Sequence, residues 1–155
     1  MSIMRTVASD DTFELDAPPE RVFPLLCPVR EHDWIPAWRA TIVHSSSGYA
    51  ELDCIFTTDN PGEGHRTWVC THYQPSRAIA FSCFSTSGYI MRLEIELEPL
   101  HETGARVRWR RRFIAYDEPG NASIDALVPE RVSAATTALA KLLAHYLTTG
   151  TMLRT

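Results

Sequence analysis

The stretch PERVSAATTALAKLLAHYLTT, residues 129–149, decides how the rest of the chain must be organised. Its apolar residues recur every three or four positions, which is typical of a helix with one buried face. They are Val132, Ala135, Leu139, Leu142, Leu143 and Tyr146. Pro129 suits the first helical turn, and Gly150 is a suitable stop just past the end. Such a helix is about 30 Å long, so it needs an apolar surface of similar length to pack on.

The chain before this helix shows the alternating apolar and polar pattern of strands, separated by turn residues. We expect strands at residues 6–16, 40–45, 49–58, 65–73, 78–85, 89–97 and 105–116. Short helices are expected at residues 19–26 and 30–34, with another capped by Ser123. Short connections favour antiparallel neighbours. The sequence therefore predicts an α+β fold in which an antiparallel sheet of about seven strands packs on the long helix.

Charges on the last two expected strands predict how these strands pair. The polar face of residues 89–97 and the turn after it is acidic, and the polar face of residues 105–116 is basic. The acidic residues are Glu94, Glu96 and Glu98, and the basic residues are Arg106, Arg108, Arg110 and Arg112. Facing each other across a hairpin, they would form cross-strand pairs of a few tenths of a kcal/mol to about 1 kcal/mol each. The arginine-rich run is thus interpreted as a partnered surface.

Bulk properties narrow the class of protein. The chain has 155 residues and 45% apolar residues, which predicts a single globular domain over residues 1–155. A net charge of −4 gives no reason to expect nucleic-acid binding. No apolar run is long enough for a membrane span or a signal peptide. The four cysteines lack metal-binding spacing, so we expect reduced thiols in a cytoplasmic protein, and a homodimer is left open.

The order of these elements, together with several short motifs, resembles the START-like superfamily, also called SRPBCC or helix-grip proteins. The motifs are Ala17-Pro-Pro-Glu-Arg-Val-Phe23, Trp34-Ile-Pro-Ala-Trp38, Thr67-Trp-Val69 with Tyr73-Gln-Pro75, and Leu97-Glu-Pro-Leu100 before Gly104. The resemblance implies a curved sheet wrapped around the long helix with an internal cavity between them. It transfers no catalytic residue, because members of this superfamily serve many functions.

Alternation along the strands identifies residues that would face this cavity. On the last strand Val107, Trp109, Arg111 and Phe113 share one face, and on its neighbour the shared face includes Tyr89, Met91 and Leu93. Leu139 would face them from the helix. Arg111 is the unusual member, because a charge on an apolar stripe needs a partner or water. It either extends to the rim of the cavity, pairs with an internal acid, or binds a carboxylate or enolate in the cavity.

A second set of candidates lies on residues 65–73 and around the expected cavity mouth. Either Trp68, Cys70 and His72 face inward, or Thr67, Val69, Thr71 and Tyr73 do, so an imidazole or a phenol enters the cavity. Either group could act as an acid or a base, or be an ordinary polar residue of the wall. Trp34 and Trp38 are interpreted as packing or gate residues. The six histidines show no metal-binding spacing, and no cofactor motif is present.

These features lead us to expect that the protein binds a small hydrophobic ligand, lipid-like or polyketide-like, in the cavity. One alternative is a cyclase or dehydratase acting on a polyketide-like substrate through Arg111, His72 or Tyr73. Another is a protein-interaction module of the chaperone-activator type. A cavity with convergent polar groups would favour the enzyme, and a dry, purely apolar cavity would favour a carrier. A collapsed interior with a large exposed apolar patch would favour the interaction module.

Overall fold

The computed structural model describes residues 3–154. Seven strands form one antiparallel sheet in the order β1-β7-β6-β5-β4-β3-β2. Their bounds are β1 Thr6–Leu15, β2 Ala40–His44, β3 Ile55–Thr58, β4 Arg66–Gln74, β5 Ala78–Ser85, β6 Tyr89–Leu100 and β7 Gly104–Ala115. The predicted α+β class, with a long C-terminal helix on an antiparallel sheet, is confirmed.

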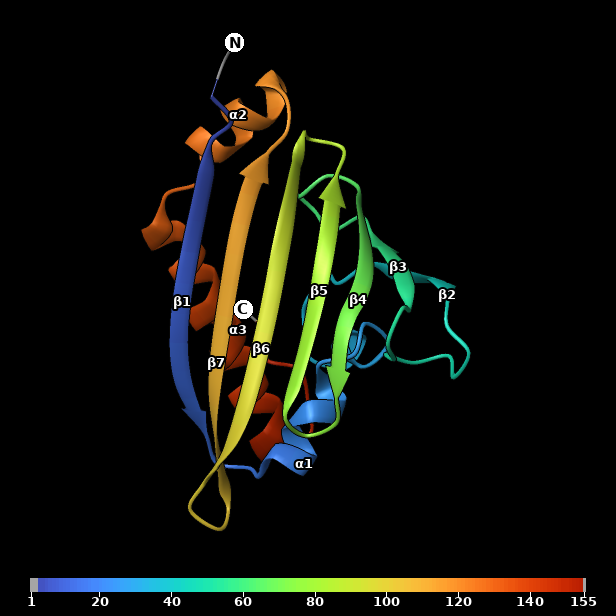
Figure 1. Cartoon of the computed structure of the whole chain (residues 1–155). Coiled ribbons are helices and arrows are strands. Elements are labelled where there is room, and N and C mark those ends of the chain that lie inside the picture. Colours follow the sequence, from blue (N-terminus) through green and yellow to red (C-terminus); the bar gives the residue numbers. More distant parts are fainter. Residues whose placement is uncertain (1–2, 155) are drawn as a thin grey trace.

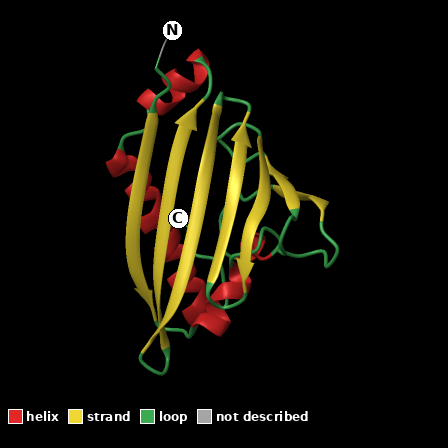
Figure 2. Ribbon diagram, in the orientation of Figure 1, coloured by secondary structure: helices red, strands yellow, loops and turns green. Residues whose placement is uncertain are grey.

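Helices cover one face of the sheet only. The long helix α3, Pro129–Thr149, runs behind the sheet in Figure 1, while the face toward the viewer carries no helix (Figures 1 and 2). We call the face toward α3 the inner face and the opposite one the outer face. Between β1 and β2 lie α1 (Pro19–Val22) and the 3₁₀ turns η1 (Phe23–Leu25) and η2 (Arg30–Asp33). Helix α2, Glu118–Asp125, connects β7 to α3.

The long helix begins and ends where its sequence predicts. Pro129 opens it, and Gly150 follows it with a left-handed φ of 72° while its N–H donates to the carbonyl of Tyr146. Fewer residues of the helix are buried than its apolar stripe predicts, since Ala135 is exposed and Leu139 is only partly buried. The helix packs most closely on β1, and a pocket separates much of its length from the middle strands.

Two local predictions are wrong. The expected strand at residues 49–58 is a strand only from Ile55, because the carboxylate of Glu51 folds back and accepts the backbone N–H groups of Ser46 and Ser47 at 3.0 and 2.7 Å. These hydrogen bonds, led by those of Ser47, lower the pKa of Glu51 to about 2. Likewise Ser123 is not a helix cap: α2 starts earlier, and the carboxylate of Asp117 caps it by accepting the N–H of Gly120.

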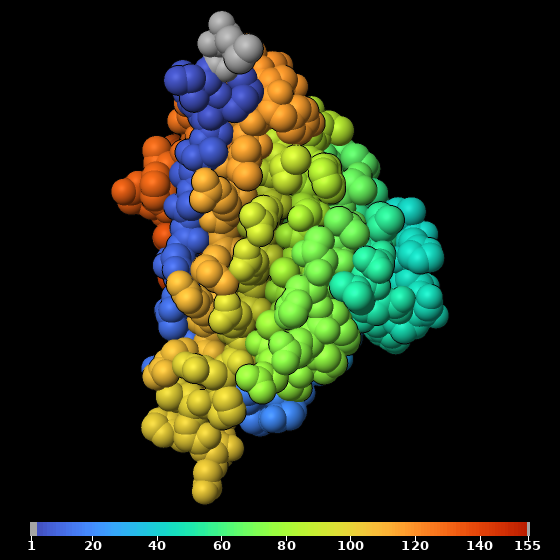
Figure 3. Space-filling view, viewed as in Figure 1, coloured from blue at the N-terminus to red at the C-terminus, as the bar shows by residue number. Residues whose placement is uncertain are grey.

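The predicted charge pairing of β6 and β7 is confirmed for Arg106 and Arg110, whereas Arg112 lies opposite Arg92 and not opposite an acid. Glu94 lies opposite Arg110, and Glu98 lies opposite Arg106. Arg110 contacts both Glu94 at 2.8 Å and Glu96 at 2.6 Å. Arg108 instead reaches across to Asp10 of β1 at 2.6 Å. All of these side chains project from the outer face, which Figure 3 shows uncovered by any helix.

The core lies between the sheet and the helical elements. Trp68 stacks on Phe56 with ring centroids 5.5 Å apart, and Phe81 meets both rings edge-on. All four cysteines are free and buried. Within residues 3–154 no helix is long and apolar enough to cross a membrane.

Candidate functional site

A pocket of about 530 Å³ lies between the inner face of the sheet and α3. We call it the inner pocket. Its floor comes from the sheet, one side from α3, and its mouth from the segment after η2 and the β3–β4 loop. Most of its wall is apolar or aromatic, through Ile35, Trp38, Phe56, Trp68, Phe81, Met91, Leu93, Trp109, Phe113, Val132 and Leu139. Its size and its lining are typical of small-molecule sites.

Arg111 is the charged group of the pocket floor. Its guanidinium donates to the hydroxyl of Thr136 at 2.5 Å and to the carbonyl of Val132 at 3.4 Å, both on α3. It also lies over the ring of Trp109, 5.6 Å from the centroid. Among the described residues no carboxylate lies within ion-pair distance of it. Burial lowers the pKa of Arg111 to about 10, and nearby Arg66 acts in the same direction, so the side chain is charged at neutral pH.

A second arginine at the pocket has partners. Arg66 contacts Glu63 at 2.5 Å and donates to the hydroxyl of Tyr89 at 2.6 Å. Burial opposes the charge of Arg66, but Glu63 and Tyr89 outweigh that effect and raise its pKa. Its Nε atom is buried and has no partner among the described atoms. Arg66 is therefore held in place by Glu63 and Tyr89.

Glu31 supplies a carboxyl group from the opposite wall. It lies on η2 and lines the inner pocket beside Ile35 and Trp38. Among the described residues no hydrogen bond or ion pair to its carboxyl oxygens is found. Burial alone raises the pKa of Glu31 to about 8, because a desolvated carboxyl without partners favours its neutral form. A carboxyl group of this kind can donate or accept a proton near neutral pH.

The structure brings most of the predicted cavity residues together. Those that line the inner pocket are Trp38, Met91, Leu93, Trp109, Arg111, Phe113 and Leu139. Trp34 does not line it: its side chain is fully buried and donates to the carbonyl of Leu25 at 2.9 Å. Cys70 is buried outside the pocket lining. Tyr89 does not line the pocket either, but its hydroxyl accepts a hydrogen bond from Arg66, which does.

A β-bulge in β4 decides whether His72 or Tyr73 faces the inside of the protein. The pairing of β4 with β5 shifts between Cys70 and His72, so one extra residue reverses the alternation. Trp68 and Cys70 face inward, and so does Tyr73, which packs edge-on against Phe23 at 5.5 Å. His72 is exposed on the outer face. Tyr73 is outside the lining of the inner pocket, so neither side chain reaches it.

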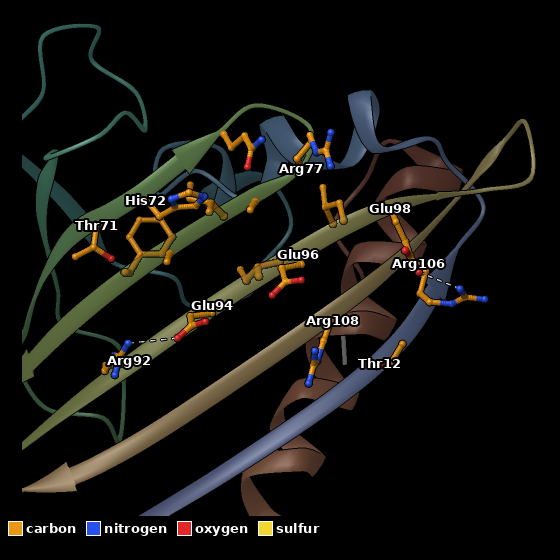
Figure 4. A pocket seen from close by; sticks show the side chains of 17 residues that line it. Thr12, Thr71, His72, Arg77, Arg92, Glu94, Glu96, Glu98, Arg106 and Arg108 are labelled. Carbon is orange, nitrogen blue, oxygen red and sulfur yellow. Dashed lines mark hydrogen bonds and ion pairs between the residues drawn. The ribbon is translucent and has the colours of Figure 1, made fainter.

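His72 lines a groove of about 770 Å³ on the outer face (Figure 4). We call this the outer groove. Its other polar groups include Arg92, Glu94, Arg106 and Arg108, which Figure 4 shows lying along the sheet. Each of these arginines is already in an ion pair: Arg92 with Glu94, Arg106 with Glu98, Arg108 with Asp10. Arg77 also lines the groove, is exposed and forms no ion pair within the described residues, so most but not all of the arginines of the outer groove are paired.

Sequence reasoning missed Glu31, Glu63 and Arg66. Arg66 could have been found, because alternation along β4 places it on the same face as Trp68. Glu31 gives a weaker signal, since a short 3₁₀ turn has no long periodic pattern to show which side faces inward. Glu63 lies in a loop, where periodicity says nothing about contacts.

The fold and pocket define a helix-grip protein, and comparison with known families identifies the family. Residues 6–148 match the family described as polyketide cyclase / dehydrase and lipid transport. The chain belongs to this family. No curated protein matches it.

Solved structures share the fold at low sequence identity. Norcoclaurine synthase from Thalictrum flavum, in complex with dopamine and hydroxybenzaldehyde, has a TM-score of 0.66 at 11% identity, covering 93% of this chain and 87% of that one. A hypothetical protein from Helicobacter pylori has a TM-score of 0.73 at 12% identity, covering 90% and 87%. A protein from Chromobacterium violaceum has a TM-score of 0.63 at 19% identity, covering 90% and 94%. At these identities the matches establish the fold alone.

Proposed function

We propose that the protein binds a small, mainly apolar ligand in the inner pocket, with an anionic or strongly polar end at Arg111. The observation that carries the proposal is a partly buried arginine without a carboxylate partner among the described residues, on the floor of a mainly apolar pocket. A guanidinium binds carboxylates and similar groups through several N–H donors at once. The surrounding aromatic and aliphatic side chains would hold the apolar body. Family membership supports this, because the family description includes lipid transport.

The open interior favours ligand binding over the interaction module. A pocket of about 530 Å³ remains between helix and sheet, whereas a module of that type would call for a collapsed interior. The convergence of Arg111, Arg66 and Glu31 on the same pocket favours the enzyme, a cyclase or dehydratase, as the second candidate.

Two alanines of α3 allow a matched test of the binding site. Ala138 lines the inner pocket and Ala134 does not, although both are exposed on the same helix. Ala138→Trp should obstruct the pocket and weaken binding of the fluorescent probe anilinonaphthalene sulfonate by about tenfold or more, which corresponds to about 1.4 kcal/mol. Ala134→Trp should bind the probe like the unchanged protein. Equal affinity of both variants would contradict binding in this pocket.

A further inference from the structure

Glu31 has the features of a functional residue and not those of a residue that stabilises the fold. It faces an apolar pocket from η2, and no described side chain or backbone N–H satisfies its carboxyl oxygens. Its side chain is only partly exposed, and a partly desolvated carboxyl without partners costs free energy and adds no contact that holds the fold. The neighbouring acid on the same turn, Asp33, shows the ordinary alternative, because it is exposed and paired with Arg30 at 2.9 Å.

The charged groups around the pocket leave Glu31 isolated. From the β3–β4 loop and β4, Glu63 and Arg66 pair with each other. From β7, Arg111 is turned toward α3. From α3 itself, Arg131 donates to the carbonyl of Ala126. On the turn of Glu31, the remaining titratable groups also face elsewhere: Arg30 pairs with Asp33, and His32 contacts the carbonyl of Ala40. Within residues 3–154 no cation therefore pairs with the carboxylate, and burial sets its protonation.

We propose that Glu31 is the proton-transfer group of the inner pocket, acting on carbonyl compounds that carry an acidic C–H next to the carbonyl. The carboxylate of Glu31 takes that proton, the C–H electron pair becomes a C=C bond, and the carbonyl pair moves to oxygen. The resulting enolate oxygen faces Arg111, which stabilises the developing charge. Return of the proton to a different atom of the enolate completes an isomerisation. In a dehydration the carbonyl re-forms, the C=C pair shifts toward the next carbon, the bond from that carbon to its hydroxyl breaks, and Glu31 protonates the hydroxyl so that water leaves. Neither reaction needs an oxidant or a reductant. This inference rests on the ligand-binding role of the same pocket.

The shape of the site suits this division of roles. Arg111 comes from the sheet and Glu31 from the turn at the mouth, so a ligand lying between them contacts both walls. The mainly apolar walls reduce the hydration of the carboxylate, which keeps it reactive as a base. Arg111 holds its charge throughout, whereas Glu31 gains and loses its proton near neutral pH. The two groups are therefore suited to different steps of one reaction.

Nitrobenzisoxazole provides a test that needs no knowledge of the natural substrate. A base removes the single proton on its five-membered ring, the C–H pair completes a nitrile, and the N–O bond breaks to give a coloured phenolate. The protein should accelerate this reaction, and the rate should rise with pH to a plateau, with a midpoint at about 8 that reports the pKa of Glu31. Glu31→Gln should lower the rate by about 100-fold or more. Glu31→Asp should retain part of it, and Asp33→Asn should behave like the unchanged protein.

Binding of the same probe, measured by quenching of tryptophan fluorescence, separates the two proposals. Bound probe with no acceleration would overturn the role of Glu31 and leave the pocket as a binding site. Full activity of a folded Glu31→Gln variant, or equal losses in Glu31→Gln and Asp33→Asn, would overturn it as well. Failure of the unchanged protein to bind either this probe or anilinonaphthalene sulfonate would overturn both proposals.

Discussion

The two faces of β7 carry arginines in opposite circumstances. On the outer face Arg106, Arg108 and Arg110 each contact an acidic side chain of a neighbouring strand. On the inner face Arg111 contacts a hydroxyl and a carbonyl of α3 and has no carboxylate partner among the described residues. One strand thus holds paired charges in water and an unpaired charge over an apolar pocket.

This difference separates structural charges from candidate functional ones. Exposed ion pairs contribute little free energy but fix which residues of two strands lie opposite each other. A buried charge without a counter-ion is costly to keep, and groups of this kind gather at functional sites. Glu31 repeats the contrast on η2, where Asp33 is paired and Glu31 is not. The unpaired members of both comparisons line the inner pocket.

The largest effect on the free energy of unfolding should come from the titration of Glu31, the acid without a partner. The pKa of Glu31 is raised from 4.5 to about 8 in the folded protein, so between these values the folded state holds the proton more tightly than the unfolded state. The stabilisation is fully present below pH 4.5 and is lost as the pH rises through about 8. One pKa unit corresponds to about 1.4 kcal/mol, and partial exposure reduces the total, so we expect a loss on the order of 1–2 kcal/mol.

Glu31→Gln removes this titration. The free energy of unfolding, measured by urea denaturation at several pH values, should fall with pH more in the unchanged protein than in the variant. Parallel curves for the two proteins would show that Glu31 is solvated and would weaken the contrast with Asp33.

The outer face should give a much smaller effect. Arg108→Met breaks the exposed pair with Asp10 and should change the free energy of unfolding by about 0.2–1 kcal/mol, less at high salt. Urea denaturation at low and high salt measures both quantities. A loss above about 2 kcal/mol would place Arg108 outside the ordinary range of surface substitutions and would remove the distinction between the two faces.

The sequence predicted the features that repeat over many residues. The stripe of α3 predicted its bounds, and the acidic and basic residues predicted that these two strands pair, as Glu94 opposite Arg110 shows. Long periodic patterns succeed because each additional residue supports the same geometry. The same alternation placed Arg111 and Phe113 on the inner face, where they line the pocket.

Features determined by single residues could not be predicted in this way. The bulge after Cys70 reverses the direction of His72 and Tyr73, and the alternation of the strand contains no sign of it. The carboxylate of Glu51 replaces an expected strand with a loop through hydrogen bonds to its own turn. The environment of Glu31 depends on which distant segments cover it. Such features depend on tertiary contacts, so they require the structure.

The selectivity of Arg111→Met tests the central claim most directly. Methionine keeps much of the apolar bulk and removes the charge, so the variant should bind anilinonaphthalene sulfonate more weakly by about 1.5–3 kcal/mol, the range for a hydrogen bond to a charged group. Its affinity for the neutral analogue phenylnaphthylamine should be nearly unchanged. Arg108→Met, from the outer face of the same strand, should bind both probes like the unchanged protein. If a folded Arg111→Met variant, checked by circular dichroism, lost neither probe or lost both equally, Arg111 would be a structural tie to α3 and not the anion-binding group of the pocket.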